Sequence, residues 1–135
     1  MEQETLYQRL GCEQGVSQLV TGFYQHMDTL PSATTIRAMH SSDLSDSREK
    51  LLQYFSGWFG GPPLFVERYG PPRLRARHNH LAIAVADRDA WMQCMQLALV
   101  DMSLDAILLE DLLAKIAPMA DHMGNVEEPQ PLSDC

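Results

Sequence analysis

Three short segments in the middle of the chain decide its fold: GGPPLF at residues 60–65, RLRARH at residues 73–78 and DAW at residues 89–91. The first segment stops a helix, because glycine readily leaves the helical conformation and proline cannot continue it. The second segment gathers arginines in an otherwise acidic chain and ends in His78. The third segment belongs to a new apolar pattern of helical spacing. The histidine therefore lies between two helical regions.

Apolar residues recur at helical spacing on both sides of these segments, and the period-two alternation of strands is nearly absent. We therefore predict an all-α protein. The clearest stripe lies in the first long helix and consists of Val16, Leu19, Val20, Phe23, Tyr24 and Met27. We expect helices over residues 14–29, 73–78, 87–102 and 104–123. A further helix is expected to start after cap residues in the segment 41–49 and to end at about residue 59.

Shorter features complete this prediction. Residues 6–10 predict a single helical turn, and residues 34–39 form a short segment that leads to His40. Asp87 is expected to cap the helix that follows it. Residues 64–72 contain Gly70, Pro71 and Pro72, which predicts an irregular connection.

The composition describes one acidic domain. With 135 residues, of which 45% are hydrophobic, the chain has the size of a single domain with a sizeable core. We expect this domain to span residues 1–125, and the polar residues 126–135 to form a disordered tail. The net charge of −8 disfavours nucleic acid and anionic membranes as partners. No apolar run approaches the ~18 residues of a membrane helix.

The cysteines and the N-terminal residues indicate a compartment. Cys12, Cys94 and Cys135 are odd in number and lack metal-ligand spacing, so we expect free thiols in a reducing environment. No charged-then-apolar signal segment is present. These observations predict a cytoplasmic protein.

In their order and spacing, the three central segments resemble the truncated haemoglobins of group II. Those sequences carry a Gly-Gly-Pro segment, an Arg-Leu-Arg-x-Arg-His segment and a tryptophan after an Asp-Ala pair. The resemblance extends over residues 6–125 and includes Phe23-Tyr24 and Ala120-Asp121-x-Met123. It implies a two-on-two helical sandwich around haem. The cofactor implied is haem b, since no Cys-x-x-Cys-His is present for covalent attachment.

On one side of the haem, the resemblance implies that His78 binds the iron. Arg75 and Arg77 are expected to hold the haem propionates, with Lys50 as a further candidate. Apolar residues are the candidate walls of the haem cavity: Phe55, Ile83 and Met95. His80 lies two residues after His78 and is the alternative ligand, but only His78 follows the arginine segment.

On the opposite, distal side, the resemblance places Tyr24 and Trp91 next to the ligand as hydrogen-bond donors. His40 aligns with a position that varies in the family and could add a third donor. Ser47 and Leu51 align with the two distal-helix positions that face the ligand. Because Ser47 is small, we expect ligand entry to be little obstructed.

Three functions follow from these residues. The first is reversible binding of O2, CO and NO at ferrous haem. The second is enzymatic, either NO dioxygenase or peroxidase-like chemistry at the same haem with electrons from a reductase partner. The third is a helical interaction module that has lost haem. The sequence also leaves open that the chain forms a homodimer. His26 and His122 are expected to be solvated.

Overall fold

The computed structural model describes residues 4–70 and 85–123, with side chains of the last helix described up to residue 120. Regular structure in these ranges is helical, so the all-α prediction is confirmed. The elements are α1 (Leu6–Leu10), α2 (Cys12–Thr29), the 3-10 turn η1 (Pro31–Ala33), α3 (Thr34–Ala38), α4 (Ser45–Trp58), α5 (Leu64–Tyr69), α7 (Val85–Asp101) and α8 (Ala106–Met123). None of the described helices is long and apolar enough to cross a membrane.

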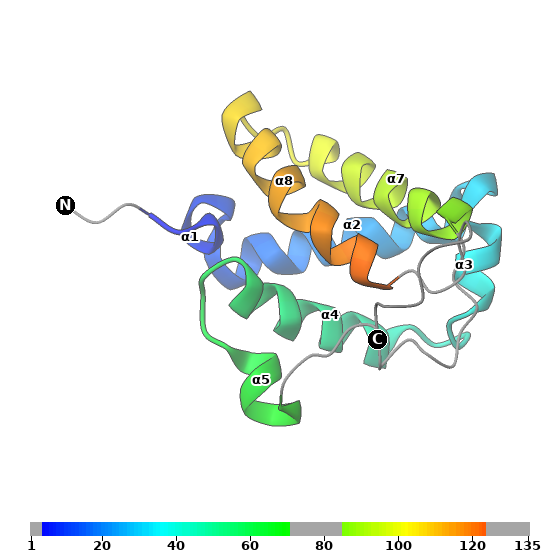
Figure 1. The fold of residues 1–135 in the computed structure, drawn as a ribbon, viewed down its shortest axis with the longest axis horizontal. Coiled ribbons are helices and arrows are strands. Elements are labelled where there is room, and N and C mark those ends of the chain that lie inside the picture. Colours follow the sequence, from blue (N-terminus) through cyan, green and yellow to red (C-terminus); the bar gives the residue numbers. More distant parts are fainter. Residues whose placement is uncertain (1–3, 71–84, 124–135) are drawn as a thin grey trace, which may run out of the picture.

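Two pairs of helices make up the body of the molecule (Figure 1). Helix α2 is central: it packs against α4 in its own pair and against α7 in the other pair, where α8 covers α7. Helix α1 closes one end by packing on α2 and α8, and α3 lies at the opposite end against α2 and α7. This arrangement confirms the expected two-on-two sandwich.

The core follows from the stripe on α2. Every residue of that stripe is buried, and Val16, Leu19, Val20 and Phe23 are fully enclosed. Because these residues recur at intervals of three and four, they share one face of the helix, and burial of that face stabilises the fold. Gly22 lies on α2 where a Cβ atom would come within 3.4 Å of Ala98 on α7, so the two helices cross closely there.

The ends of α2 and α7 are joined by a polar contact that the sequence did not predict. His26 was expected to be solvated, but its Nε2 lies 2.7 Å from Oδ2 of Asp101, at the end of α7. The ring is 26% exposed, so it is partly solvated and also lies beside a carboxylate of α7. The side chain of His122 lies outside the described residues.

Helix α5 corrects the predicted irregular connection, since residues 64–69 are helical. Pro63 precedes the helix and its carbonyl accepts a hydrogen bond from the Glu67 amide at 3.0 Å. Phe65 and Tyr69 are four residues apart, which places them on one face, with ring centroids 4.7 Å from each other. Gly70 ends the helix at a positive φ of 83°. The apolar spacing was present in the sequence, but the neighbouring prolines and glycine concealed it.

The start points of the last two helices also differ from the prediction. Asp87 lies inside the first turn of α7, where a carboxylate still favours the positive end of the helix dipole, and not at the cap. Helix α8 starts at Ala106 and not at Leu104. Its cap is Asp105, whose Oδ1 accepts a hydrogen bond from the Leu108 amide at 2.9 Å.

Gly60 and Gly61 follow α4 and allow the turn after this helix to lie directly on α1. A Cβ atom on Gly61 would come within 2.5 Å of the Tyr7 ring, and one on Gly60 within 2.9 Å of Thr5. Ser56 is buried and donates a hydrogen bond to the Pro62 carbonyl at 2.7 Å. The turn therefore needs residues without side chains, which explains the Gly-Gly pair in physical terms.

Candidate functional site

An aromatic cluster brings together three of the predicted distal residues. The Phe23 ring on α2 is in edge contact with the Tyr24 ring at 4.9 Å and with the Trp91 ring of α7 at 5.0 Å between centroids. The His40 ring, just after α3, lies 5.9 Å from the Tyr24 ring. Side chains from α2, from α7 and from the segment after α3 thus meet around Phe23.

Tyr24 supplies a neutral hydroxyl to this cluster. The residue is 7% exposed, and this burial raises the pKa of its phenol well above the ordinary value, while the Arg48 charge opposes the shift to a smaller extent. The hydroxyl forms no hydrogen bond with another residue of 4–70 or 85–120. Tyr24 therefore keeps its proton and has it free for a ligand, as far as the described chain is concerned.

Trp91 supplies a second donor on the other side of Phe23. Its side chain is partly buried, and α7 holds it near the start of the helix, after the buried Ala90. Its indole N–H, which can donate but not accept, has no acceptor among the residues that the structure describes. The cluster therefore presents two donors, from two helices, that flank one apolar ring.

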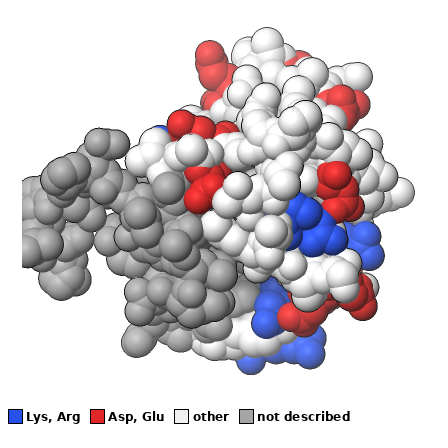
Figure 2. Space-filling view, turned by 90° about the vertical axis from the view of Figure 1, so that its right-hand side faces the viewer, with Lys and Arg blue, Asp and Glu red and all other residues white. Residues whose placement is uncertain are grey.

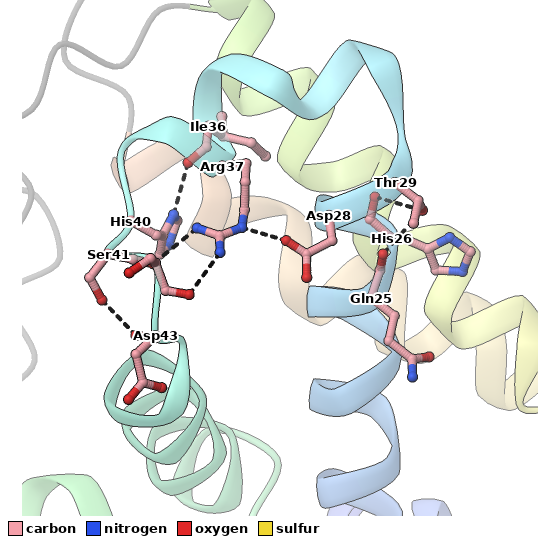
Figure 3. A network of polar contacts seen from close by, with 10 residues as sticks. Gln25, His26, Asp28, Thr29, Ile36, Arg37, His40, Ser41 and Asp43 are labelled. Atoms are coloured by element: carbon pink, nitrogen blue, oxygen red, sulfur yellow. Dashed lines mark hydrogen bonds and ion pairs between the residues drawn. The ribbon is translucent and has the colours of Figure 1, made fainter.

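The geometry of His40 restricts its predicted donor role (Figure 3). Its Nδ1 lies 2.8 Å from the backbone carbonyl oxygen of Ile36. Because a carbonyl oxygen can only accept, Nδ1 carries the proton, and Nε2 of the neutral ring holds a lone pair. His40 can donate from Nε2 only as a protonated imidazolium.

The inner face of α4 is well packed in its second half and more open in its first half. Phe55 is fully buried and stacks on Phe59 at 4.8 Å. Ser47 and Leu51, which precede it by two turns and one turn, are partly exposed. Across the sandwich, Met95 of α7 is fully buried. The inner face of α4 is therefore more exposed around Ser47 and Leu51 than around Phe55.

Lys50 lies in a different setting from the distal residues. Its Nζ is 3.3 Å from Oδ2 of Asp46, one turn earlier on α4, and lies 5.5 Å from the centre of the Tyr69 ring of α5. The side chain is 48% exposed. Its expected contact with a propionate stays a prediction.

The other predicted haem contacts lie outside the described residues: His78, Arg75, Arg77 and Ile83, together with the alternative ligand His80. Within the described chain, no group of three or more His, Cys, Asp or Glu side chains is arranged to hold a metal ion. Haem iron does not require such a group, because one protein nitrogen and the porphyrin are sufficient to hold it.

The described residues fit haem. A porphyrin needs apolar walls, which Leu51, Phe55 and Met95 provide on two facing helices. A gas ligand on its iron needs donors in a mostly dry setting, and Tyr24 and Trp91 have donors without a described acceptor. Tyr24, Phe55 and Met95 belong to one buried cluster, and Leu51 and Trp91 pack against it.

Two features of the cluster escaped the sequence prediction. Phe23 was placed in the core stripe and not in the site, although its position next to Tyr24 was a usable signal. The Ile36 carbonyl that fixes the His40 ring left no signal, because a backbone group carries no residue-type information.

Charges of both signs lie side by side at the end of the molecule that carries α3 (Figure 2). One pair there joins Arg37 of α3 to Asp28 of α2. In the described part of this face, the basic side chains do not form a single broad patch. The described part of this face therefore carries mixed charge.

Comparison with known proteins identifies the family. The family model described as "Bacterial-like globin" matches residues 5–125. The chain is 35% identical to group 2 truncated haemoglobin YjbI of Bacillus subtilis (strain 168), over 90% of this chain and 89% of that protein. The solved group II 2-on-2 haemoglobin of Agrobacterium tumefaciens is 42% identical with a TM-score of 0.87, and the alignment covers 95% of this chain and 98% of that chain.

A further solved structure, described as the truncated oxygen-avid haemoglobin of Bacillus subtilis, is 34% identical with a TM-score of 0.82. Its alignment covers 90% of this chain and 100% of that chain. The matches span almost the whole described fold, and the matched structures agree with the two helical pairs. The chain therefore belongs to the bacterial-like globins and, within them, to the group II truncated haemoglobins, whose cofactor is haem b.

Proposed function

We propose that this protein reversibly binds O2, and also CO and NO, at ferrous haem b, with His78 as the protein ligand of the iron. The observation that carries the proposal is the pair of donors around Phe23, since neither Tyr24 nor Trp91 has an acceptor among the described residues. The printed description of the Bacillus subtilis structure as oxygen-avid supports O2 as the ligand.

The bound haem supplies an iron atom that takes diatomic gases. Tyr24 and Trp91 donate hydrogen bonds to such a gas, and each bond is worth about 1 kcal/mol, or more where the acceptor carries charge. Phe23 and Leu51 reduce the access of water, which strengthens these bonds by lowering the local dielectric constant. Ser47 is small and leaves the distal edge without a bulky gate.

The role of His78 rests on its position after the arginine segment and on membership of the family. In this proposal, Arg75 and Arg77 hold the propionates through charge-assisted hydrogen bonds. Lys50 is the further candidate, and it would have to leave Asp46 to take part.

An absorption spectrum of the purified full chain tests the iron ligand. We expect a strong Soret band after reconstitution with haem. His78→Ala should weaken haem retention or change the coordination bands in the ferric and ferrous spectra. His80→Ala is the matched control and should leave both spectra as they are. An unchanged His78→Ala spectrum, or a change confined to His80→Ala, would contradict the proposal.

A further inference from the structure

A single guanidinium group joins three parts of the chain near the distal cluster (Figure 3). Nε of Arg37, on α3, donates to Oδ1 of Asp28 on α2 at 2.5 Å. Nη1 and Nη2 of the same residue donate to the carbonyl oxygens of Ser41 at 3.0 Å and Ser42 at 3.1 Å. We call these four residues the Arg37 clamp. It ties the irregular segment before α4 to the last turns of α2.

His40 lies inside the segment that the clamp holds. Its amide donates to the Arg37 carbonyl at 3.1 Å, and its Nδ1 donates to the Ile36 carbonyl at 2.8 Å. These two bonds fix the orientation of the ring, which lies in T-shaped contact with the Tyr24 ring at a centroid distance of 5.9 Å. Movement of residues 39–42 would therefore reach Tyr24 through this ring.

The chemistry of arginine suits this function. Its guanidinium is planar and always charged, and its donors form a rigid fork, so three bonds in different directions fix the acceptors relative to one another. The Arg37 side chain is 24% exposed, which protects these bonds in part from water. Asp28 neutralises the charge and anchors the fork to a helix whose inner face is fully packed.

We propose that Arg37 is a positioning residue of the distal site. Through Asp28 it fixes the segment of residues 39–42, and the His40 ring on that segment then holds the Tyr24 ring in place. Loss of the clamp lets the phenol move and admits water, and both effects weaken the hydrogen bond from Tyr24 to the gas. This inference rests on the proposed function, because it requires that Tyr24 faces the gas ligand.

The test compares two arginines that each form one surface ion pair. Arg37→Ala should speed the release of O2 from the ferrous protein about two- to fivefold, the range expected for one weakened hydrogen bond. The C–O stretching band of the CO form should broaden or split, because Tyr24 then takes more than one position. Arg9→Ala is the matched control: it removes an ion pair of 3.0 Å with Asp111 between α1 and α8, and α1 lies at the end of the molecule opposite α3. It should leave the rate and the band unchanged.

Combining Arg37→Ala with His40→Ala shows whether Arg37 acts through His40. His40→Ala should also speed O2 release, and adding Arg37→Ala to it should give no further increase. Arg37→Lys keeps the charge but cannot reach Asp28 and both carbonyls together, so it should restore part of the parent rate. A merely structural role would lower the unfolding temperature in both the Arg37 and the Arg9 variants without these spectral and kinetic changes.

Three results would overturn the inference: an unchanged O2 release rate in Arg37→Ala, an unchanged rate in His40→Ala, or an Arg37→Ala effect of full size in the His40→Ala background. Tyr24→Phe separates this failure from failure of the proposed function. If Tyr24→Phe speeds O2 release and Arg37→Ala does not, only the positioning role is wrong. If Tyr24→Phe leaves O2 release unchanged, the distal donor role is wrong and the positioning role is wrong with it.

Discussion

At the scale of single residues, the site depends on hydrogen-bond donors that have no acceptor among the described residues. Tyr24 is the clearest case, because its hydroxyl lies in the core stripe of α2. This hydroxyl has no hydrogen-bond acceptor in the described chain and is not one of its fully buried polar atoms, so it is available to donate to a ligand. The sequence indicated which residue types would meet. It did not indicate the hydrogen bond that fixes His40, since that acceptor is a backbone carbonyl.

We predict that Tyr24 is the last tyrosine to ionise. The chain has four tyrosines. Burial raises the pKa of Tyr24 most, whereas burial raises the pKa of Tyr54 to about 12. In a spectrophotometric titration of the folded protein, the component with the highest pKa should disappear in Tyr24→Phe. Its persistence in that variant would contradict the assignment.

At the scale of elements, strongly periodic segments could be predicted and irregular ones could not. The stripe on α2 gave the core and the position of Tyr24, because burial of one helix face imposes that spacing. Helix α5 was missed, since Gly70, Pro71 and Pro72 favoured an irregular connection over residues 64–72. The Asp105 cap was missed because an apolar residue before it extended the helical pattern. The Arg37 clamp joins residues of α2 and the segment before α4, and no local pattern encodes such a contact.

The turn after α4 gives a prediction at the same scale. Gly61→Ala should lower the free energy of unfolding by about 1–3 kcal/mol, the usual cost of overpacking, because the new Cβ would overlap the Tyr7 ring. Gly22→Ala is the matched control. Its Cβ would come no closer than 3.4 Å to Ala98, and alanine is the better helix former by about 0.5–1 kcal/mol. Urea unfolding of both variants measures the difference, and equal stabilities would contradict this account of the turn.

At the scale of the whole molecule, the fold is a thin sandwich whose interior is shared between core and site. Phe23 and Tyr24 both belong to the core stripe of α2 and to the aromatic cluster. Such sharing explains why the helical pattern alone placed Phe23 and Tyr24 in the core, whereas the roles of the candidate site residues came from the resemblance to the family and stay predictions. It also means that buried titratable groups influence stability as well as function.

Alkaline pH should therefore weaken the fold. Burial raises the pKa of the Cys94 thiol from its ordinary value of 9.0 to about 11. Between these values the folded state keeps the proton and the unfolded state loses it. This contribution to stability is full below about pH 9 and falls as the pH rises towards about 11. The free energy of unfolding, measured in urea between about pH 9 and pH 11, should fall less steeply with pH in Cys94→Ala than in the parent protein. Cys12→Ala changes an exposed cysteine, so its free energy of unfolding should fall as steeply as that of the parent.

The most direct measurement is the rate at which the ferrous protein releases O2, in stopped flow, for Tyr24→Phe, Trp91→Phe and the control Tyr54→Phe. Tyr54 is also a buried tyrosine, but its ring stacks on Trp58 and has no described ring contact with Phe23, Tyr24, His40 or Trp91. Loss of one donor should raise the rate about fivefold in each distal variant, more if the gas carries charge, and Tyr54→Phe should match the parent. Equal rates in all four proteins would contradict the assignment of Tyr24 and Trp91 as the donors that hold the gas.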